Sequence, residues 1–215
     1  MQQPLRVPPT APARLVVLAS GTGSLLESVL AAAVDDYPAR VVAVGTDRLC
    51  RALEIGAAAG AATFTTSLRD HADRAGWDVA LTEAVAAHEP DPSKRYVYGH
   101  SLGTAVATEL AIDAGARDGV AGVILEGGFT SLPEMAKALA PSWLPIDWLV
   151  TQRFDTIDKV AKVPAPMLFV HGTGDRLVPY RFSEALYAAA REPKKLVLVE
   201  GGGHYNTSWV GASLY

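Results

Sequence analysis

Residues 96–110, YVYGHSLGTAVATEL, give the clearest indication of the fold. The first three of these residues are β-branched or aromatic, as in a strand, and the last seven place apolar residues at helical spacing. Between them, GHSLG at 99–103 fits the pattern GxSxG, in which a tight turn exposes a serine hydroxyl on a strained backbone. The stretch therefore predicts a strand, a sharp turn and a helix, the repeating unit of a parallel α/β sheet.

The same alternation extends along the chain in both directions. Short β-branched runs predict strands at 14–19, 40–45, 63–66, 95–98, 122–126, 166–170 and 195–200. Longer Ala- and Leu-rich runs predict helices at 24–33, 51–59, 77–87, 102–114 and 181–191. We expect an α/β fold: a single, doubly wound, mostly parallel sheet of about seven strands in the order 3-2-1-4-5-6-7, with helices on both faces.

Bulk composition excludes several classes of protein. The 215 residues are 49% apolar and 20% charged, enough for one large core, and we expect one α/β domain made of two halves, 1–91 and 92–215. The formal net charge is -4 and no dense Lys/Arg patch occurs, so a nucleic-acid partner is not expected. No apolar run approaches the roughly 20 residues that span a bilayer, so no membrane span is expected.

The cysteine and proline content bears on localisation. Cys50 is the single cysteine and has no partner for an intramolecular disulfide. Residues 1–13 are interrupted by four prolines and contain no apolar core of a signal peptide. We expect a cytoplasmic protein. The five histidines do not fall at metal-ligand spacings, so no metal and no other cofactor is expected.

Three residues at the ends of predicted strands form a candidate catalytic set. Ser101 lies in the GxSxG turn, Asp175 follows the strand 166–170, and His204 follows the strand 195–200. A serine hydroxyl is a weak nucleophile until a base takes its proton, and an acid orients that base. The order Ser, Asp, His predicts Ser101 as nucleophile, His204 as general base and Asp175 as the orienting acid. The backbone N–H of Leu102, at a helix start, is a candidate oxyanion donor.

Residues 92–215 resemble the catalytic half of an α/β-hydrolase of the ABHD13/BEM46-like type. The resemblance rests on YGHSLG at 98–103, VILEGGFTS at 123–131, FVHGTGD at 169–175 and VEGGGH at 199–204. It implies hydrolysis of acyl esters or related substrates by the same serine, histidine and aspartate. The family's early strands and its His-Gly-Asn type oxyanion loop are not found before Ser101, and the chain stops where a closing helix would be expected.

Residues 1–91 resemble a different family, the N-terminal part of phosphoribosylglycinamide formyltransferase. The matching stretches are RLVVLASGTGSLL at 14–26, YPARVVAVG at 37–45 and AHEPD at 87–91. In that family a Gly-rich loop at a helix start holds the substrate phosphate, which implies a phosphate site at Gly23 and Ser24. The family's catalytic and folate-binding residues would lie beyond residue 91, so formyl transfer is excluded. Leu26, at the third glycine position, argues against a dinucleotide site.

The two resemblances together predict a recombined chain, natural or engineered, joined near residues 91–93. In a continuous sheet the loops after the first and fourth strands face each other, so backbone N–H groups of Gly21 and Thr22 could substitute for the missing oxyanion loop. The apolar segment 129–163 is either a cap over a site or a cover for one face of the sheet.

The sequence is compatible with three functions. The first is a serine hydrolase acting on a small-molecule ester or acyl substrate, with low turnover because losing one oxyanion donor costs about 10²- to 10³-fold. The second is a catalytically silent scaffold of two recombined halves. The third is a phosphate- or nucleotide-binding protein that uses the loop 21–24. The oligomeric state is left open.

Overall fold

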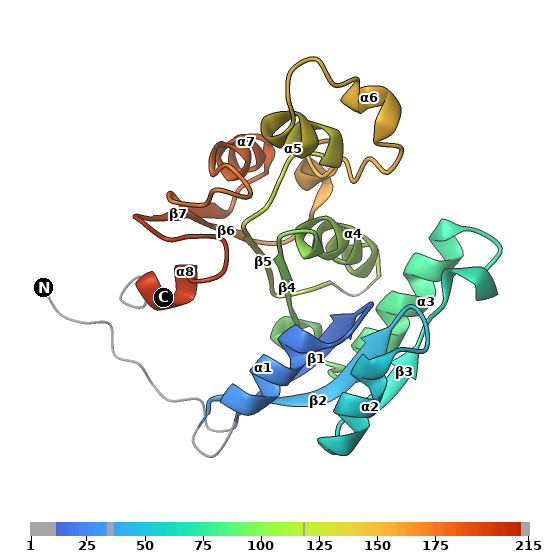
Figure 1. The fold of residues 1–215 in the computed structure, drawn as a ribbon. Coiled ribbons are helices and arrows are strands. Elements are labelled where there is room, and N and C mark those ends of the chain that lie inside the picture. Colours follow the sequence, from blue (N-terminus) through green and yellow to red (C-terminus); the bar gives the residue numbers. More distant parts are fainter. Residues whose placement is uncertain (1–11, 34–36, 118, 212–215) are drawn as a thin grey trace, which may run out of the picture. The chain divides into compact units, whose positions relative to one another are not determined.

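The computed structural model describes residues 12–33, 37–117 and 119–211. The chain divides into two compact units, Met1–Pro90 and Asp91–Tyr215, each with its own sheet and its own core (Figure 1). The boundary lies next to the junction at which the sequence changes its resemblance. That the two halves form one domain stays a prediction.

The first unit is a three-stranded parallel sheet with its helices. Strands β1 (Ala13–Ala19), β2 (Ala39–Thr46) and β3 (Ala62–Thr65) lie in the order β1-β2-β3. Helices α1 (Ser24–Ala32) and α2 (Arg51–Ala58) contact each other, and α2 packs on β2 and β3. Its core contains Leu26, Val44, Ala52 and Ala61.

The first unit ends in a short turn, η1 (Leu68–Asp70), and helix α3 (Arg74–Ala86). Asp73 begins this helix, because its side chain accepts the Gly76 N–H at 2.8 Å. Trp77 links the helix to the end of β3, since its ring Nε1–H donates to the carbonyl of Thr66, the residue after that strand, at 2.6 Å.

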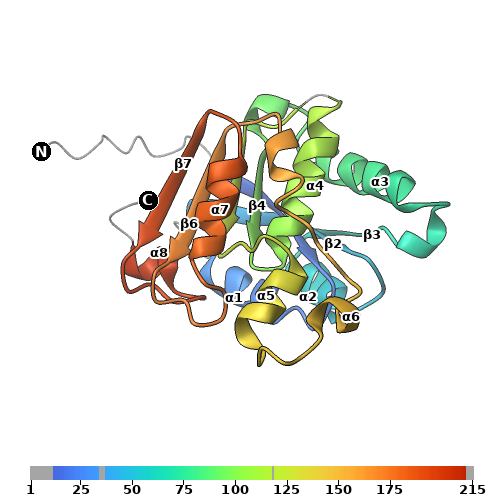
Figure 2. The same ribbon diagram turned by 90° about the horizontal axis from the view of Figure 1, so that it is seen from above.

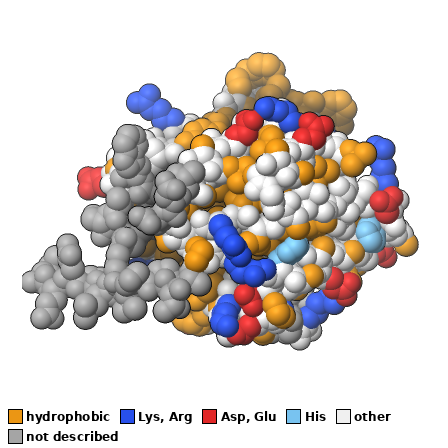
Figure 3. All heavy atoms as spheres, turned by 90° about the horizontal axis from the view of Figure 1, so that it is seen from below, with side chains coloured by type: hydrophobic (Ala, Val, Ile, Leu, Met, Phe, Trp, Pro, Cys, Tyr) orange, Lys and Arg blue, Asp and Glu red, His pale blue; other side chains and the backbone are white. Residues whose placement is uncertain are grey.

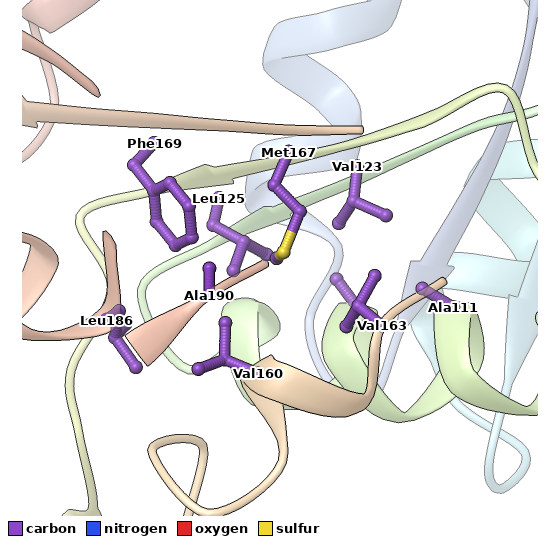
Figure 4. Close-up of a cluster of buried hydrophobic side chains, with 10 residues drawn as sticks. Ala111, Val123, Leu125, Val160, Val163, Met167, Phe169, Leu186 and Ala190 are labelled. Carbon is purple, nitrogen blue, oxygen red and sulfur yellow. The ribbon is translucent and has the colours of Figure 1, made fainter. Parts of the chain in front are cut away.

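The second unit is a four-stranded parallel sheet. After the turn η2 (Pro92–Lys94), strands β4 (Tyr96–His100), β5 (Gly122–Glu126), β6 (Met167–Gly172) and β7 (Lys194–Val199) lie in sequence order. Helices α4 (Gly103–Gly115) and α7 (Arg181–Ala189) pack with the turn η3 (Val160–Lys162) on one face of this sheet (Figure 2). Figure 4 shows the core between them, and its labelled side chains are Ala111, Val123, Leu125, Val160, Val163, Met167, Phe169, Leu186 and Ala190.

The register of the second sheet brings several strand ends to one edge. His100 pairs with Glu126, Glu126 with Val170, and Gly172 with Val199. Because all four strands are parallel, the loops that follow β4, β6 and β7 leave from this same edge. These are the loops that contain Ser101, Asp175 and His204.

The prediction of a single seven-stranded sheet is wrong. The α/β class, the parallel strands and the flanking helices are confirmed, but the described residues form one sheet of three strands and one of four, with no ladder joining β1 to β4. The expected order 3-2-1-4-5-6-7 assumed that these two edges would pair. Pairing needs the backbone donors and acceptors of both edges to register over several residues, and an apolar pattern carries no information on that register.

The segment 129–163 contains two helices that the sequence did not predict, α5 (Leu132–Leu139) and α6 (Ile146–Leu149). Its two ends belong to buried cores, through Phe129 at one end and Val160 at the other. Its middle is different, because Trp143 and Trp148 are 78% and 79% exposed. The segment is therefore buried at both ends and exposes two tryptophan side chains in its middle, and whether it is a cap or a cover for the sheet stays open.

The surface carries charges of both signs. On the face drawn in Figure 3, Lys and Arg side chains lie among Asp and Glu side chains rather than in a patch of one sign. Within the described part of the chain, no helix has both the length and the apolar character that crossing a bilayer requires.

Candidate active site

Ser101 occupies the sharp turn between β4 and α4. Its φ is 53°, in the left-handed region that a serine rarely adopts, at a cost of about 1–3 kcal/mol. Two neighbours hold it there. Its N–H donates to the carbonyl of Glu126 at 2.9 Å, and its carbonyl accepts the Thr104 hydroxyl at 2.6 Å. The strand–turn–helix predicted from GxSxG is present, and the following residue, Leu102, lies at the start of α4.

Gly99 allows β4 and α4 to approach closely just before this turn. A Cβ at this position would lie 2.4 Å from the carbonyl oxygen of Gly103 and 2.7 Å from Cβ of Ala107. Gly103, at the other end of the motif, has open space around it. The two glycines of GxSxG therefore have different roles, and only the first is required by packing.

We expect Gly99→Ala to destabilise the chain by about 1–3 kcal/mol, because the backbone of α4 must shift to admit the methyl group. Gly103→Ala is the matched control and should leave stability within about 0.5 kcal/mol of wild type. The measurement is the urea midpoint of each variant. Equal midpoints for the two variants would show that the close approach at Gly99 does not matter.

Asp175 and His204 form a buried hydrogen-bonded pair. His204 Nδ1–H donates to Asp175 Oδ2 at 2.6 Å, and both residues are less than a tenth exposed. The other carboxylate oxygen, Oδ1, accepts the N–H groups of Leu177 and Val178, each at 2.8 Å. Burial opposes ionisation of Asp175, but the hydrogen bonds from Val178, His204 and Leu177 outweigh it and hold the pKa of Asp175 below its ordinary value.

The glycines before His204 let its loop lie against the loop of Asp175. The Gly174 N–H donates to the carbonyl of Gly202 at 2.9 Å, and the Gly201 N–H donates to the Thr173 hydroxyl at 3.0 Å. A Cβ on Gly172 would lie 2.1 Å from the same Gly202 carbonyl. Backbone therefore meets backbone between the two loops, which places Asp175 beside His204.

The strand ends β4 and β5 hold the His204 loop from the other side. His100 Nε2–H donates to the carbonyl of His204 at 2.7 Å, and the two rings lie 4.8 Å apart. The buried carboxylate of Glu126 accepts the Thr207 hydroxyl, three residues beyond His204, and the Tyr98 hydroxyl at 2.6 Å. The loop is thus fixed by contacts from three strand ends.

The structure joins two of the three predicted catalytic residues directly. His204 Nε2, on the far side of the ring from Asp175, is buried and has no hydrogen-bond partner among the described residues, Ser101 included. A catalytic hydrogen bond is often long in the substrate-free state and shortens only when substrate binds. The imidazole therefore has one nitrogen held by a carboxylate and one nitrogen available to accept a proton.

The residues of the predicted phosphate and second oxyanion sites all lie in the first unit. Gly21, Thr22 and Gly23 form the turn between β1 and α1, and Ser24 is the first residue of α1. Gly23 has a φ of 77° and packs against α2, where a Cβ would lie 2.9 Å from Ile55. The prediction that Gly21 and Thr22 share an oxyanion site with Leu102 stays a prediction.

The sequence did not predict the roles of four polar residues of the site. His100, Glu126 and Thr207 hold the His204 loop, and His171 contacts Asp175. Glu126 and His171 had a signal, because each is a titratable side chain in an otherwise apolar strand. Among residues 12–33, 37–117 and 119–211, no three His, Cys, Asp or Glu side chains gather as metal ligands would.

His171 gives the second unit a pH dependence of stability. Burial lowers the pKa of His171 below its ordinary value of 6.5, although the Val178 carbonyl and the Asp175 carboxylate favour the charged form. As the pH falls, the unfolded chain therefore binds a proton at this residue at a higher pH than the folded chain does. Stability contributed by neutral His171 is present above pH 6.5 and falls as the pH drops below that value.

We expect the urea midpoint of wild type to fall more between pH 7.5 and pH 5 than that of His171→Gln, which cannot titrate. His71→Gln, which removes a histidine from the first unit, is the comparison variant. The midpoints at the two pH values measure the effect. A His171→Gln slope as steep as wild type would mean that other groups cause the pH dependence.

The second unit is similar to proteins of the α/β-hydrolase type. It has a parallel sheet, a serine on a strand-to-helix turn and a histidine–aspartate pair at the same sheet edge. The model of the TAP-like protein family (Abhydrolase_4) matches residues 138–211, a span that includes Asp175 and His204 and begins after Ser101.

Particular relatives match different parts of the chain. The N-terminal region is 72% identical over 91 residues to phosphoribosylglycinamide formyltransferase of Mycobacterium tuberculosis, covering 42% of this chain and 42% of that protein. An uncharacterized protein of the same organism is 41% identical over 114 residues, covering 53% of this chain and 39% of that protein. Both resemblances read from the sequence are confirmed, and the chain spans less than half the length of these curated relatives.

A solved structure agrees with the fold. The esterase domain of a Rhodothermus marinus protein has a TM-score of 0.53 with this chain, at 19% identity, over 96% of this chain and 86% of that one. At this level of identity the likeness shows the fold alone.

Proposed function

We propose that the chain is a serine-dependent hydrolase of ester or acyl substrates, with Ser101 as nucleophile, His204 as general base and Asp175 as the acid that orients it. The observation that carries the proposal is the state of His204. Its Nδ1 is bonded to a buried carboxylate while its buried Nε2 has no partner, and a buried polar atom left unpaired costs about 1–3 kcal/mol. An unpaired ring nitrogen is what a general base needs in order to accept the proton of a serine hydroxyl.

The proposed reaction has two halves. In the first, Ser101 Oγ attacks the carbonyl carbon of the ester as His204 Nε2 takes its proton, and the imidazolium is stabilised by Asp175. The negative charge that develops on the carbonyl oxygen is stabilised by the Leu102 N–H at the start of α4. The intermediate then collapses, the alcohol leaves with the proton from His204, and an acyl group remains on Ser101. In the second half, water repeats these steps and releases the acid.

Three exposed side chains within two positions of the proposed catalytic residues favour an apolar acyl group. Leu102 is 49% exposed, Leu177 is 43% exposed and Tyr205 is 82% exposed. The Tyr205 ring packs edge-on against the His204 ring, with centroids 4.7 Å apart. Exposed apolar surface beside the reacting groups can bury an acyl chain at about 25 cal/mol per Å². Turnover is expected to be low, because the proposed reaction uses a single oxyanion donor from the second unit, the Leu102 N–H.

A fluorophosphonate probe tests the proposal, because it reacts with a serine only when a base activates it. We expect the probe to label the chain once, with the added mass on the peptide that contains Ser101. Ser101→Ala should remove the label, and Ser93→Ala, an exposed serine of the same unit, should keep it. A folded wild type that the probe does not label would refute the proposal and favour the silent scaffold.

A further inference from the structure

His171 is a fully buried histidine of the second unit and is not one of the three proposed catalytic residues. It lies near the end of β6, four residues before Asp175. Its Nδ1 is 2.6 Å from the hydroxyl of Ser183, on α7, and its Nε2 is 2.8 Å from the carbonyl of Val178. The same Nε2 is 3.3 Å from Asp175 Oδ2.

These partners determine which ring nitrogen carries the proton. The Val178 carbonyl can only accept a hydrogen bond, so Nε2 must be protonated and donate. The Ser183 hydroxyl can donate, and it then satisfies the unprotonated Nδ1. Burial keeps the ring in this neutral form. His171 is therefore a neutral donor whose one polar proton faces both a carbonyl and a carboxylate.

The carboxylate is the one that binds His204. Asp175 Oδ2 receives His204 Nδ1–H from one side and faces His171 Nε2–H from the other, while Oδ1 is held by the Leu177 and Val178 N–H groups. His171 also holds the Val178 carbonyl, at the far end of the turn that begins at Asp175. Without this donor, Oδ2 would be located by His204 alone, and the Val178 carbonyl would lose its hydrogen bond to β6.

We propose that His171 is a positioning residue for the hydrolytic site: a neutral, buried donor that holds Asp175 Oδ2 in line with His204 Nδ1. The inference rests on the proposed function for its role in the reaction, but the arrangement itself can be measured without turnover. A core histidine that merely fills space would need no donor at Nε2, and an apolar side chain of similar size would replace it.

Two amide variants separate a positioning role from a space-filling one. The side-chain nitrogen of His171→Gln lies as many bonds from Cβ as Nε2 does, so it can reach Val178 and Asp175. The amide of His171→Asn is one bond shorter and cannot. The readout is the downfield NMR signal of the His204 Nδ1–H proton, which reports its hydrogen bond to Asp175. We expect the signal to persist in His171→Gln and to disappear in His171→Asn.

The rate of fluorophosphonate labelling gives a second readout. We expect His171→Gln to label within about threefold of wild type and His171→Asn to label about 10- to 100-fold more slowly, as for a misplaced catalytic group. His71→Gln, in the first unit, is the control and should match wild type in both readouts. If His171→Asn keeps both the NMR signal and the labelling rate, the positioning role is overturned.

The outcomes distinguish this inference from the proposed function. A wild type that is never labelled defeats the hydrolase, yet the NMR signal in the two variants still decides whether His171 holds Asp175. A wild type that is labelled, with both variants unchanged, defeats only the role of His171. If the variants do not fold, the ¹⁵N spectrum of wild type decides: protonated Nε2 and unprotonated Nδ1 at neutral pH support the inference, and the reverse overturns it.

Discussion

Replacing His204 by alanine is expected to lower the rate at which a fluorophosphonate labels Ser101 by at least about 10⁴-fold, with the fold retained. The variant removes the nitrogen that would take the serine proton, and no other described side chain bonds to Asp175 Oδ2 as closely as His204 does. The measurement is the pseudo-first-order labelling rate at neutral pH, with circular dichroism as the check on folding.

His100 is the matched control, since its ring lies only 4.8 Å from that of His204. Its Nε2 already donates to the His204 carbonyl, so it can hold the loop but is not oriented by a carboxylate. The amide nitrogen of His100→Gln lies at the same number of bonds from Cβ, and we expect labelling within about tenfold of wild type. Rapid labelling of His204→Ala together with loss of labelling in His100→Gln would reverse the assignment and make His100 the base.

Asp175→Asn is expected to slow labelling by about 10⁴-fold, the cost of holding the imidazole in the wrong tautomer. The contacts of the Asp175 carboxylate determine how the new asparagine amide is oriented. The Leu177 and Val178 N–H groups require an acceptor at Oδ1, so the new amide nitrogen must replace Oδ2 and face His204 Nδ1. Two donors cannot share that contact, and His204 would place its proton on Nε2, where it can no longer accept the proton of Ser101.

Asp147→Asn serves as the control for this substitution, because Asp147 is an exposed carboxylate on α6 that pairs with Lys137. We expect it to label as wild type does. If the labelling rate of Asp175→Asn is less than about tenfold below that of wild type, the carboxylate does not orient the base.

Much of this site could be predicted from the sequence because it lies at strand ends. The pattern GxSxG between an aromatic strand and an Ala-rich helix predicted the turn that holds Ser101 at a φ of 53°. The positions of Ser101, Asp175 and His204 after three predicted strands predicted one sheet edge, and the register of β4 to β7 agrees. Local pattern was sufficient, since each feature depends on a few adjacent residues.

The features that the sequence did not predict depend on distant residues. The predicted pairing of β1 with β4 is wrong, because such pairing needs a register between the two halves that no local pattern encodes, and the described strands form two sheets. The roles of His171 and Glu126 depend on partners 12 and 81 residues away, Ser183 and Thr207. A titratable residue in an apolar strand signals that some partner exists but does not identify it.

The origin of the chain bears on how well these parts cooperate. One region matches a formyltransferase and residues 138–211 match the TAP-like protein family, so the chain combines sequence of two kinds. That it arose by recombination or engineering stays a prediction. Ser101, Asp175 and His204 all belong to the second unit, so the proposed chemistry does not require the first unit to supply any of the three.

The most direct test of the account is a crystal structure of the chain after reaction with a fluorophosphonate. We predict continuous density from Ser101 Oγ to phosphorus, with His204 Nε2 within about 3.2 Å of Oγ and Asp175 still bonded to Nδ1. An unmodified Ser101 in a folded chain, or a modified one with the His204 ring turned away from it, would contradict the claim that these three side chains act together.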